Sequence, residues 1–375
     1  MTLSFFVATF LTGWVVHSGG LVGHHMLDHD VTGPQKFHAK PVPRVGGVGI
    51  VAGLMAVCLS LIWLQPPGGA RTLMALLLCA GPVFIVGLIE DLTKAVSPSK
   101  RLLAAAISAA LAFWTMDAAI TRTDIPGLDE IVRYTLGALL VTMLAVSGIA
   151  NSVNIIDGFN GLASMCVMLM LAALAYVAFQ VGDILLGTLA VAGIGAVLGF
   201  FLWNFPLGLV FLGDGGAYFL GFYVAELALL LLVRNPSVSP LFPLLVCIYP
   251  VFETVFSIYR RRFLRSLPPS VPDGIHLHSL IYRRVLRWAV GDRSARTLTR
   301  RNSMTAPFLW ALCMLSVVPA VLFWNSTPAM AGFLGLFVIS YVALYWRIVR
   351  FRSPRWLRLL ARERAGLGRR DNRRT

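Results

Sequence analysis

The sequence predicts an all-α protein, a polytopic bundle of about eleven transmembrane helices, and three observations support this fold class. Of 375 residues, 57% are hydrophobic and only 13% are charged, whereas roughly a quarter of the residues in a soluble domain are charged. Apolar runs of about 17–25 residues, the length that crosses a bilayer, recur along nearly the whole chain. Lys and Arg collect in alternate connections between these runs. These features exclude an ordinary soluble enzyme.

The first apolar run has no preceding Lys or Arg and no small-residue cleavage site, so we expect it to be a retained helix and not a removable signal peptide. The other runs follow at regular intervals. The predicted spans are 3–22, 45–64, 72–90, 102–119, 134–150, 162–179, 184–203, 216–233, 238–258, 305–324 and 328–346.

The distribution of Lys and Arg predicts a periplasmic N-terminus and a cytoplasmic C-terminus, because these residues are enriched in cytoplasmic loops. With this orientation, 28 of the 32 Lys and Arg residues lie inside, including 11 Arg between 260 and 304 and 11 after 346. Those left outside are Arg71, Arg122, Arg133 and Arg234. The net charge of +15 is therefore mainly a topology signal.

Two regions follow from this topology, a membrane domain over 1–346 and a basic cytoplasmic tail over 347–375. Trp and Leu alternate with Arg in the tail, which is typical of a helix at the surface of anionic membrane lipids. We therefore expect no nucleic acid partner. The five cysteines lie in apolar runs without CxxC spacing, so neither a disulfide framework nor a zinc site is predicted.

The polar clusters of the chain fall in five loops on the predicted cytoplasmic side, whereas the outside connections resemble ordinary turns. This one-sided clustering indicates an active site open to the cytoplasm, since a transport pathway needs polar groups near mid-membrane. The active-site loops are 23–44, 90–101, 151–161, 204–215 and 259–304.

An acidic pair ends the third predicted span, where Glu90 and Asp91 are expected to emerge at the cytoplasmic surface. Because Mg²⁺ in phosphate chemistry usually takes one or two protein carboxylates, one of the pair could face a metal and the other a nucleophile. Basic residues that would bind an anionic substrate lie near the pair. The loop that follows it carries Lys94, Lys100 and Arg101, and the first cytoplasmic loop carries Lys36, His38 and Arg44.

The segment 154–161 places Asn154, Asp157 and Asn160 at spacing i, i+3, i+6, so a helical segment would present them on one face. Amides and a carboxylate arranged in this way suit a nucleobase or a sugar. In the following loop, Asn204 offers a hydrogen bond and Phe211 an aromatic platform. Asp214 precedes the eighth span, either as a helix cap or as a functional carboxylate.

The last cytoplasmic loop supplies Asp273, His276 and His278 among arginines. We expect anion handling by the two histidines, with zinc binding or a structural role as the alternatives. Two glutamates lie within apolar spans, where an ionised side chain is costly. Glu253 is within two helical turns of Arg260, and Glu226 lies nearer mid-span.

These clusters, in this order, resemble the superfamily of polyprenyl-phosphate N-acetylhexosamine-1-phosphate transferases, the MraY and WecA type, over roughly residues 28 to 284. Three positions depart from the family pattern: Glu90 in place of Asp, Asn160 in place of Asp, and Ser279 in place of His. The motif DxxxxxxxHxxPxPRxGG corresponds to Asp30, His38, Pro41, Pro43, Arg44, Gly46 and Gly47, followed by the acidic pair, NxxDGxDG at 154–161, the Asp214 motif and the histidine loop.

The resemblance implies that undecaprenyl phosphate attacks the β-phosphorus of a UDP-N-acetylhexosamine, giving a lipid-diphospho-sugar and UMP. It implies Mg²⁺, with Mn²⁺ as an alternative, held by Asp214, Asp91 and Glu90. Asp91 is then the catalytic base or the group that orients the nucleophile, with a covalent phospho-enzyme as the minor alternative. Glu90, His276 and His278 would support catalysis.

The implied setting is the bacterial cytoplasmic membrane, with the active site facing the cytoplasm and a homodimer as one further state. The motifs look closer to the branch that uses UDP-GlcNAc or a related sugar to start lipid-linked surface glycans. The alternatives are the peptidoglycan branch, which transfers phospho-MurNAc-pentapeptide, a lipid transporter or scramblase, and a catalytically degenerate scaffold.

Overall fold

The computed structural model describes residues 1–18, 27–28, 42–264, 275–286 and 295–350. Three predicted substrate-binding residues, Lys36, His38 and Asp273, lie outside the described residues, as does the tail after Arg350.

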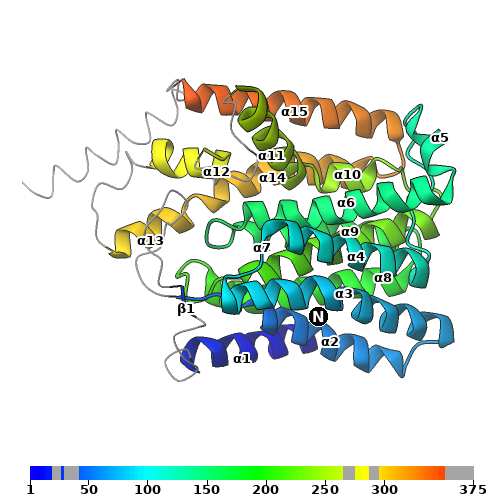
Figure 1. Ribbon diagram of the computed structural model, residues 1–375, viewed down its shortest axis with the longest axis horizontal. Helices are drawn as coiled ribbons and strands as arrows, with labels where there is room; N and C mark the ends of the chain where they lie inside the picture. Colours follow the sequence, from blue (N-terminus) through cyan, green and yellow to red (C-terminus); the bar gives the residue numbers. More distant parts are fainter. Residues whose placement is uncertain (19–26, 29–41, 265–274, 287–294, 351–375) are drawn as a thin grey trace, which may run out of the picture.

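The described residues form a bundle of helices that run in roughly one direction (Figure 1). The helices of the first part are α1 Thr2–Ser18, α2 Gly47–Ile62, α3 Pro67–Thr93, α4 Pro98–Met116, α5 Leu128–Val132, α6 Thr135–Ile156, α7 Leu162–Gln180, α8 Ile184–Asn204 and α9 Gly213–Arg234. Those of the second part are α10 Phe242–Val246, α11 Ile248–Tyr259, α12 Leu277–Leu280, α13 Ala295–Ser303, α14 Ala306–Leu322 and α15 Thr327–Val349, with π-helical turns at Arg260–Leu264 and Ile281–Val285. Two short strands, β1 Leu27–Asp28 and β2 Val42–Pro43, pair antiparallel.

Every predicted span overlaps a helix, and within the described residues seven helical stretches are long and apolar enough to cross a membrane. The helices α1 and α2 are apolar but shorter. Proline in the first turn begins α3, α4, α10, α14 and α15, where its missing N–H removes no helical hydrogen bond. The all-α polytopic fold is thus confirmed.

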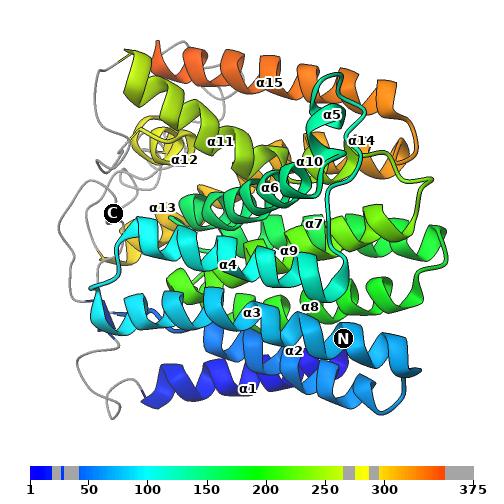
Figure 2. The same cartoon turned by 45° about the vertical axis from the view of Figure 1, so that its right-hand side comes forward.

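The ninth predicted span, 238–258, is not one helix. It is divided at Cys247 into α10 and α11. Pro250 has no N–H to donate to the carbonyl of Val246, so a continuous helix would lose a hydrogen bond at this point. The break lets α11 leave the bundle axis and lie beside α12 and α15 (Figure 2).

Helix α9 is the centre of the bundle and is almost completely buried. It packs against α2, α3, α6 and α7. Glycines bring its first turn against two neighbours: a Cβ on Gly47 would lie 2.4 Å from the Cα of Gly216, and one on Gly87 would lie 2.5 Å from the Cα of Gly215. The first turn of α9 therefore packs closely between α2 and α3.

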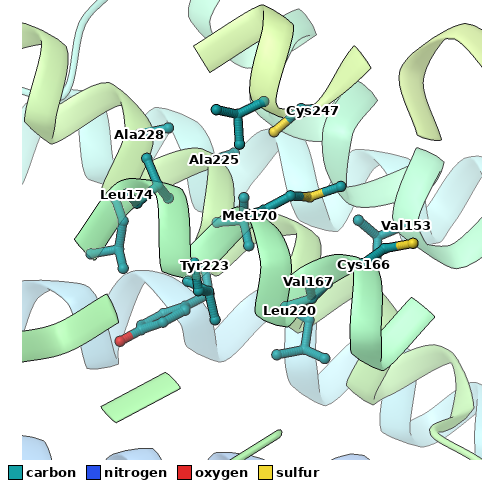
Figure 3. Close-up of a cluster of buried hydrophobic side chains, with 14 of the residues drawn as sticks. Val153, Cys166, Val167, Met170, Leu174, Leu220, Tyr223, Ala225, Ala228 and Cys247 are labelled. Atoms are coloured by element: carbon teal, nitrogen blue, oxygen red, sulfur yellow. The ribbon is translucent and has the colours of Figure 1, made fainter. Parts of the chain in front are cut away.

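Further along α9, after its first turn, α7 and α9 share an apolar core with α6 and α10 (Figure 3). Met170 and Leu220 are fully buried there, together with Cys166 and Cys247. All five cysteines are buried and unbridged, as the sequence predicts. Figure 1 shows β1, α12 and α13 at one end of the bundle and α5 at the other. The predicted cytoplasmic loops therefore meet at a single end.

Candidate active site

A pocket of about 450 Å³ opens at the end of the bundle where the predicted cytoplasmic loops meet. The lining residues extend in the sequence from Arg44 to Asn302, and the helices that carry these loops bring them together. The residues that line it are Arg44, Glu90, Arg101, Asn154, Ile155, Asp157, Gly158, Phe159, Asn160, Asn204, Phe211, Leu212, Gly213, Asp214, His276, His278, Ser279 and Asn302.

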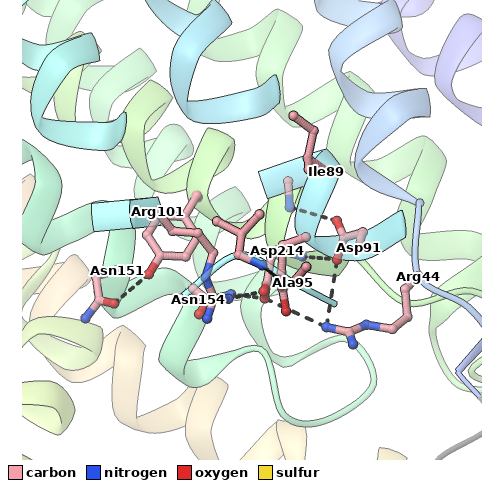
Figure 4. A network of polar contacts seen from close by, with 12 residues as sticks. Arg44, Ile89, Asp91, Ala95, Arg101, Asn151, Asn154 and Asp214 are labelled. Carbon is pink, nitrogen blue, oxygen red and sulfur yellow. Dashed lines mark hydrogen bonds and ion pairs between the residues drawn. The ribbon is translucent and has the colours of Figure 1, made fainter. Parts of the chain in front are cut away.

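Asp214 lies in the first turn of α9, where the helix dipole favours a negative charge. Its Oδ1 accepts a hydrogen bond of 2.7 Å from the amide of Asn154, and its Oδ2 forms an ion pair with Arg101. A second guanidinium, that of Arg44, lies 3.9 Å from Oδ1 (Figure 4). Asp214 is thus the carboxylate on which three predicted site residues converge.

Asp91 does not emerge at the surface, and that expectation is wrong. Helix α3 continues to Thr93, which places Asp91 in its last turn facing α9, with its side chain only 1% exposed. The Asp91 carboxylate accepts the backbone N–H groups of Asp214 at 2.7 Å and Gly215 at 2.9 Å. It therefore holds the first turn of α9 from behind the pocket, and it is not among the lining residues.

Gly213 shows how tightly this corner is packed. It has a φ of +76°, and a Cβ there would lie 1.9 Å from the carbonyl oxygen of Arg44 and 2.5 Å from Oδ2 of Asp91. Only glycine adopts that conformation without strain and leaves room for both neighbours.

The predicted cations of the loop after α3 separate in the structure. Arg101 lines the pocket, whereas Lys94 and Lys100 are exposed and do not line it. Glu90 lines the pocket and accepts the N–H of Val96 at 2.6 Å, which closes the turn between α3 and α4. The two acidic neighbours thus have different surroundings, one facing the pocket and one buried behind it.

Arg101 is held by two residues that sequence reasoning missed. Its guanidinium lies 5.8 Å from the ring centre of Tyr218, and the Tyr218 hydroxyl donates to Oδ1 of Asn151 at 2.8 Å. Asn151 belongs to the polar run that begins the third loop, which was an available signal. Tyr218 looks like any aromatic residue of a span, so its role depends on the tertiary fold.

The segment 154–161 is not a continuous helix, so the condition for one shared helical face is not met. Helix α6 ends at Ile156, and the chain turns through Gly161 with φ +72°. Asn154, Asp157 and Asn160 all line the pocket, and the Asn160 amide also donates to the Ser303 hydroxyl at 3.1 Å. The glycines of this motif allow the turn, which a helix would not need.

Two predicted nucleotide-binding amides mainly bind protein groups. The N–H of Asn160 donates to Oδ1 of Asn302 at 2.8 Å. Asn204 accepts from the N–H of Gly161 at 2.6 Å and donates to the carbonyl of Val210 at 2.7 Å. Both residues line the pocket, but these bonds tie three loops together. Their binding of substrate stays a prediction. Asn302 was missed because it directly precedes a span.

Asp157 is a third carboxylate that lines the pocket, after Asp214 and Glu90. Burial, and next the charge of Asp214, raise the pKa of Asp157 from 3.8 to about 7, and the Arg44 guanidinium opposes that shift. A carboxyl group with this pKa changes protonation near neutral pH.

The first-loop motif is anchored by backbone pairing. The N–H of Phe211 donates to the carbonyl of Pro43 at 2.8 Å, and the N–H groups of Gly46 and Gly47 donate to the carbonyls of Phe211 and Leu212 at 3.0 and 2.9 Å. Arg44 lies between these bonds, so its position at the pocket is fixed by the loop that carries Phe211.

The histidine segment lies on the opposite side of the pocket from α3. The rings of His276 and His278 are stacked with centres 5.1 Å apart, and Phe159 contacts His278. Nδ1 of His276 is 2.9 Å from Oε1 of Glu253, whereas Arg260 binds the Tyr345 hydroxyl. Within the described residues, which do not include Asp273, no group of three His, Cys, Asp or Glu side chains could hold a metal.

The donor set fits a Mg²⁺ ion that shares its coordination with substrate. Asp214 lines the pocket, where Asn154 and Arg101 hold its two oxygens, whereas Asp91 lies behind the pocket with both oxygens on backbone N–H groups. Mg²⁺ usually takes one or two protein carboxylates and completes its octahedron with water and phosphate oxygens. Asp214 is therefore the residue best placed to hold the ion, with Glu90 on the same pocket wall.

The chain is similar in sequence to known sugar-phosphate transferases. The family model described as glycosyl transferase family 4 matches residues 73–232. A probable undecaprenyl-phosphate N-acetylglucosaminyl 1-phosphate transferase of Bacillus subtilis is 28% identical over 84% of this chain and 81% of its own length. A decaprenyl-phosphate N-acetylglucosaminephosphotransferase of Mycolicibacterium smegmatis is 28% identical over 72% of each chain. A phospho-N-acetylmuramoyl-pentapeptide-transferase of Geobacillus kaustophilus is 30% identical over 53% of this chain and 64% of its own.

Proposed function

Because this chain belongs to the superfamily of polyprenyl-phosphate N-acetylhexosamine-1-phosphate transferases within glycosyl transferase family 4, we propose that it transfers N-acetylglucosamine-1-phosphate from UDP-GlcNAc to undecaprenyl phosphate. One observation carries this proposal: Asp214, Arg44 and Arg101 meet in a pocket at the loop-rich end of a helical bundle. Such a site suits a charged diphosphate that must meet a lipid substrate.

In this reaction an oxygen of the lipid phosphate forms a bond to the β-phosphorus of UDP-GlcNAc. The bond from that phosphorus to the bridging oxygen breaks, and UMP leaves with the bridging oxygen and its charge. Catalysis of phosphoryl transfer depends mainly on positioning and charge neutralisation. Arg44 and Arg101 supply positive charge to the phosphates, and Asn154 fixes the carboxylate of Asp214.

Mg²⁺ is the proposed cofactor, with Mn²⁺ as an alternative; when bound, it would neutralise the diphosphate oxygens as a Lewis acid. Asp214 would hold it, assisted by Glu90. Arg101 forms an ion pair with Asp214 in the structure, so we expect Arg101 to shift toward the diphosphate when substrate is bound. Asp91 acts chiefly by fixing Asp214 and the first turn of α9.

The proposed setting is the bacterial cytoplasmic membrane, crossed eleven times, with the pocket facing the cytoplasm. Arg300 and Arg301 of α13 lie at the same end as the pocket, which supports this orientation. The oligomeric state, including a homodimer, stays a prediction.

The sugar is proposed to be N-acetylglucosamine and not the muramoyl-pentapeptide. The two relatives named for N-acetylglucosamine phosphate transfer align over 72–84% of this chain, whereas the pentapeptide transferase aligns over 53%. The glycan that the product would start is a lipid-linked glycan of the cell envelope.

The test is UMP release by purified protein from UDP-GlcNAc, undecaprenyl phosphate and Mg²⁺. We expect Asp214→Ala to lower kcat at least about 100-fold, because pocket charges that stabilise the transition state typically contribute about 10²–10³. Glu130→Ala is the matched control, since it removes an exposed carboxylate at the other end of the bundle. Wild-type protein that releases no UMP from any UDP-N-acetylhexosamine would refute the proposal.

A further inference from the structure

Glu253 is a fully buried carboxylate that the proposed chemistry does not yet use. It lies on α11, just after the break at Cys247, and its side chain faces the histidine segment. Its Oε1 lies 2.9 Å from Nδ1 of His276 and accepts the N–H of Leu277 at 3.2 Å. Its Oε2 accepts the hydroxyl of Tyr341. Three polar groups thus converge on one carboxylate.

This arrangement determines where the hydrogen of the His276 ring lies. The backbone N–H of Leu277 can only donate, and an ionised carboxylate can only accept. A buried carboxylate is tolerated when donors satisfy it, and here the ring, the N–H and the hydroxyl do so. Nδ1 of His276 therefore carries a hydrogen, and Nε2 is the ring nitrogen that remains for the pocket that His276 lines.

Tyr341 brings a distant element into the site. It belongs to α15, which begins at Thr327, well beyond the family-model match at 73–232. One turn later on the same helix, the Tyr345 hydroxyl contacts Arg260 at 2.9 Å and the carbonyl of Ile275 at 3.4 Å. Helix α15 thus contacts both the histidine segment and the carboxylate that holds it.

We propose that Glu253 and Tyr341 are positioning residues that hold His276 with its Nδ1 hydrogen on the carboxylate and its Nε2 directed to the phosphates of the nucleotide sugar. This inference rests on the proposed function. Tyr341 fixes the carboxylate, the carboxylate fixes the ring, and His276 is the member that meets substrate. The hydrogen-bonded order of these groups is analogous to the orienting carboxylate of a catalytic histidine.

The experiment combines kinetics with a double-mutant cycle. Glu253→Gln keeps the side-chain shape, and we expect kcat to fall about 10- to 100-fold, a part of the 10²–10⁴ that a positioned acid–base group contributes. KM for UDP-GlcNAc should change less than about twofold, because the lost interaction acts mainly in the transition state. Tyr341→Phe should lower kcat less, in the same direction.

The His276→Ala background separates positioning from structure. Residues that act through His276 have nothing left to act on there, so Glu253→Gln and Tyr341→Phe should cause no further loss. Tyr223→Phe is the matched control, since it removes a buried tyrosine hydroxyl that donates to the carbonyl of Leu189 and lies away from both Glu253 and the histidine segment.

Two results would overturn the inference. In the first, Glu253→Gln or Tyr341→Phe is as active as wild type. In the second, their losses persist in the His276→Ala background or equal that of Tyr223→Phe. If Glu253→Gln does not fold, judged by its thermal midpoint, Tyr341→Phe decides. An inactive wild type would instead refute the proposed function, so the two failures are distinguishable.

Discussion

At the scale of single residues, neighbouring side chains in the sequence have unlike surroundings. Glu90 lines the pocket, whereas Asp91 lies behind it with both oxygens on the backbone of α9. The i, i+1 spacing on a helix explains this, because adjacent residues point about 100° apart. An acidic pair that looks like one motif therefore supplies two different contributions, one to the pocket wall and one to the start of α9.

Asp157 gives a pH prediction at this scale. Its pKa of about 7 exceeds the ordinary 3.8, so between these values the folded chain binds more protons than the unfolded chain. The free energy of unfolding then falls as pH rises through this window. Asparagine at position 157 cannot ionise, so the free energy of unfolding of Asp157→Asn should not fall through this cause. In EDTA and without substrate, we expect its advantage in thermal midpoint over wild type to grow from about pH 5 to about pH 8.

Asp129 provides a control, because its pKa shifts in the opposite direction from that of Asp157. A hydrogen bond from the Thr123 hydroxyl lowers the pKa of Asp129, so its stabilisation is present above the unfolded pKa and is lost as pH falls through the folded one. Asp129→Asn should therefore lower the midpoint across the same range. A constant difference between Asp157→Asn and wild type would contradict the assignment.

At the scale of elements, the helix ends matter more for the site than the spans. The first turn of α9 carries Asp214, and Asp91 and the close glycine contacts fix that turn. The break at Cys247 turns α11 toward α12 and α15, and this brings Glu253 to His276. A straight ninth helix would continue along the bundle axis and carry Glu253 elsewhere.

Glu226 supports a second prediction, on the interior of α9. It is completely buried, and within the described residues neither of its oxygens has a hydrogen-bond partner. A buried unsatisfied polar group costs about 1–3 kcal/mol. We expect Glu226→Leu to raise the thermal midpoint in detergent and to preserve UMP release.

Glu226→Gln separates this interpretation from transport. A transporter or scramblase that uses the carboxylate in mid-membrane would lose function on this change, whereas a sugar-phosphate transferase should retain its turnover. A lower midpoint for Glu226→Leu together with lost turnover for Glu226→Gln would show that the carboxylate has a functional partner.

At the scale of the whole molecule, the bundle has two unlike ends. One end carries the pocket together with α12 and α13, and the other carries α5 and short connections. Hydrogen bonds join the connections at the α5 end. The Thr327 hydroxyl donates to the Asp124 carboxylate, and the Arg122 guanidinium donates to the carbonyl of Val238. The two ends are therefore suited to different compartments.

This difference predicts the labelling of single cysteines introduced at exposed turns. In intact cells, Pro126→Cys, at the α5 end, should react with a membrane-impermeant maleimide, and Ser97→Cys, at the pocket end, should react only after permeabilisation. The five native cysteines are buried and supply a low background. The reverse labelling pattern would invert the proposed orientation and place the pocket outside the cytoplasm.

The sequence by itself determined the fold class, the approximate helices and the set of loops that form the pocket. Apolar length and charge distribution are local properties, so they can be recognised without knowledge of the fold. Arg44, Arg101, Asn154, Asp157 and Asp214 were identified from the polar clusters in these loops, and all line one pocket. The residues 19–26, 29–41, 265–274, 287–294 and 351–375 lie outside the described structure, so the predictions for Lys36, His38 and Asp273 stay predictions.

Only the tertiary structure decided what each polar side chain binds. Asp91 is buried because α3 continues past it and packs on α9, and Asn160 and Asn204 join loops because the chain turns after Ile156. Tyr218 and Tyr341 look like ordinary residues of spans, and Glu253 stands out only as a carboxylate within one, while the groups that they bind lie elsewhere in the sequence. A hydrogen bond requires two groups within about 3 Å, and for residues this far apart in the sequence only the packing of helices decides which groups meet.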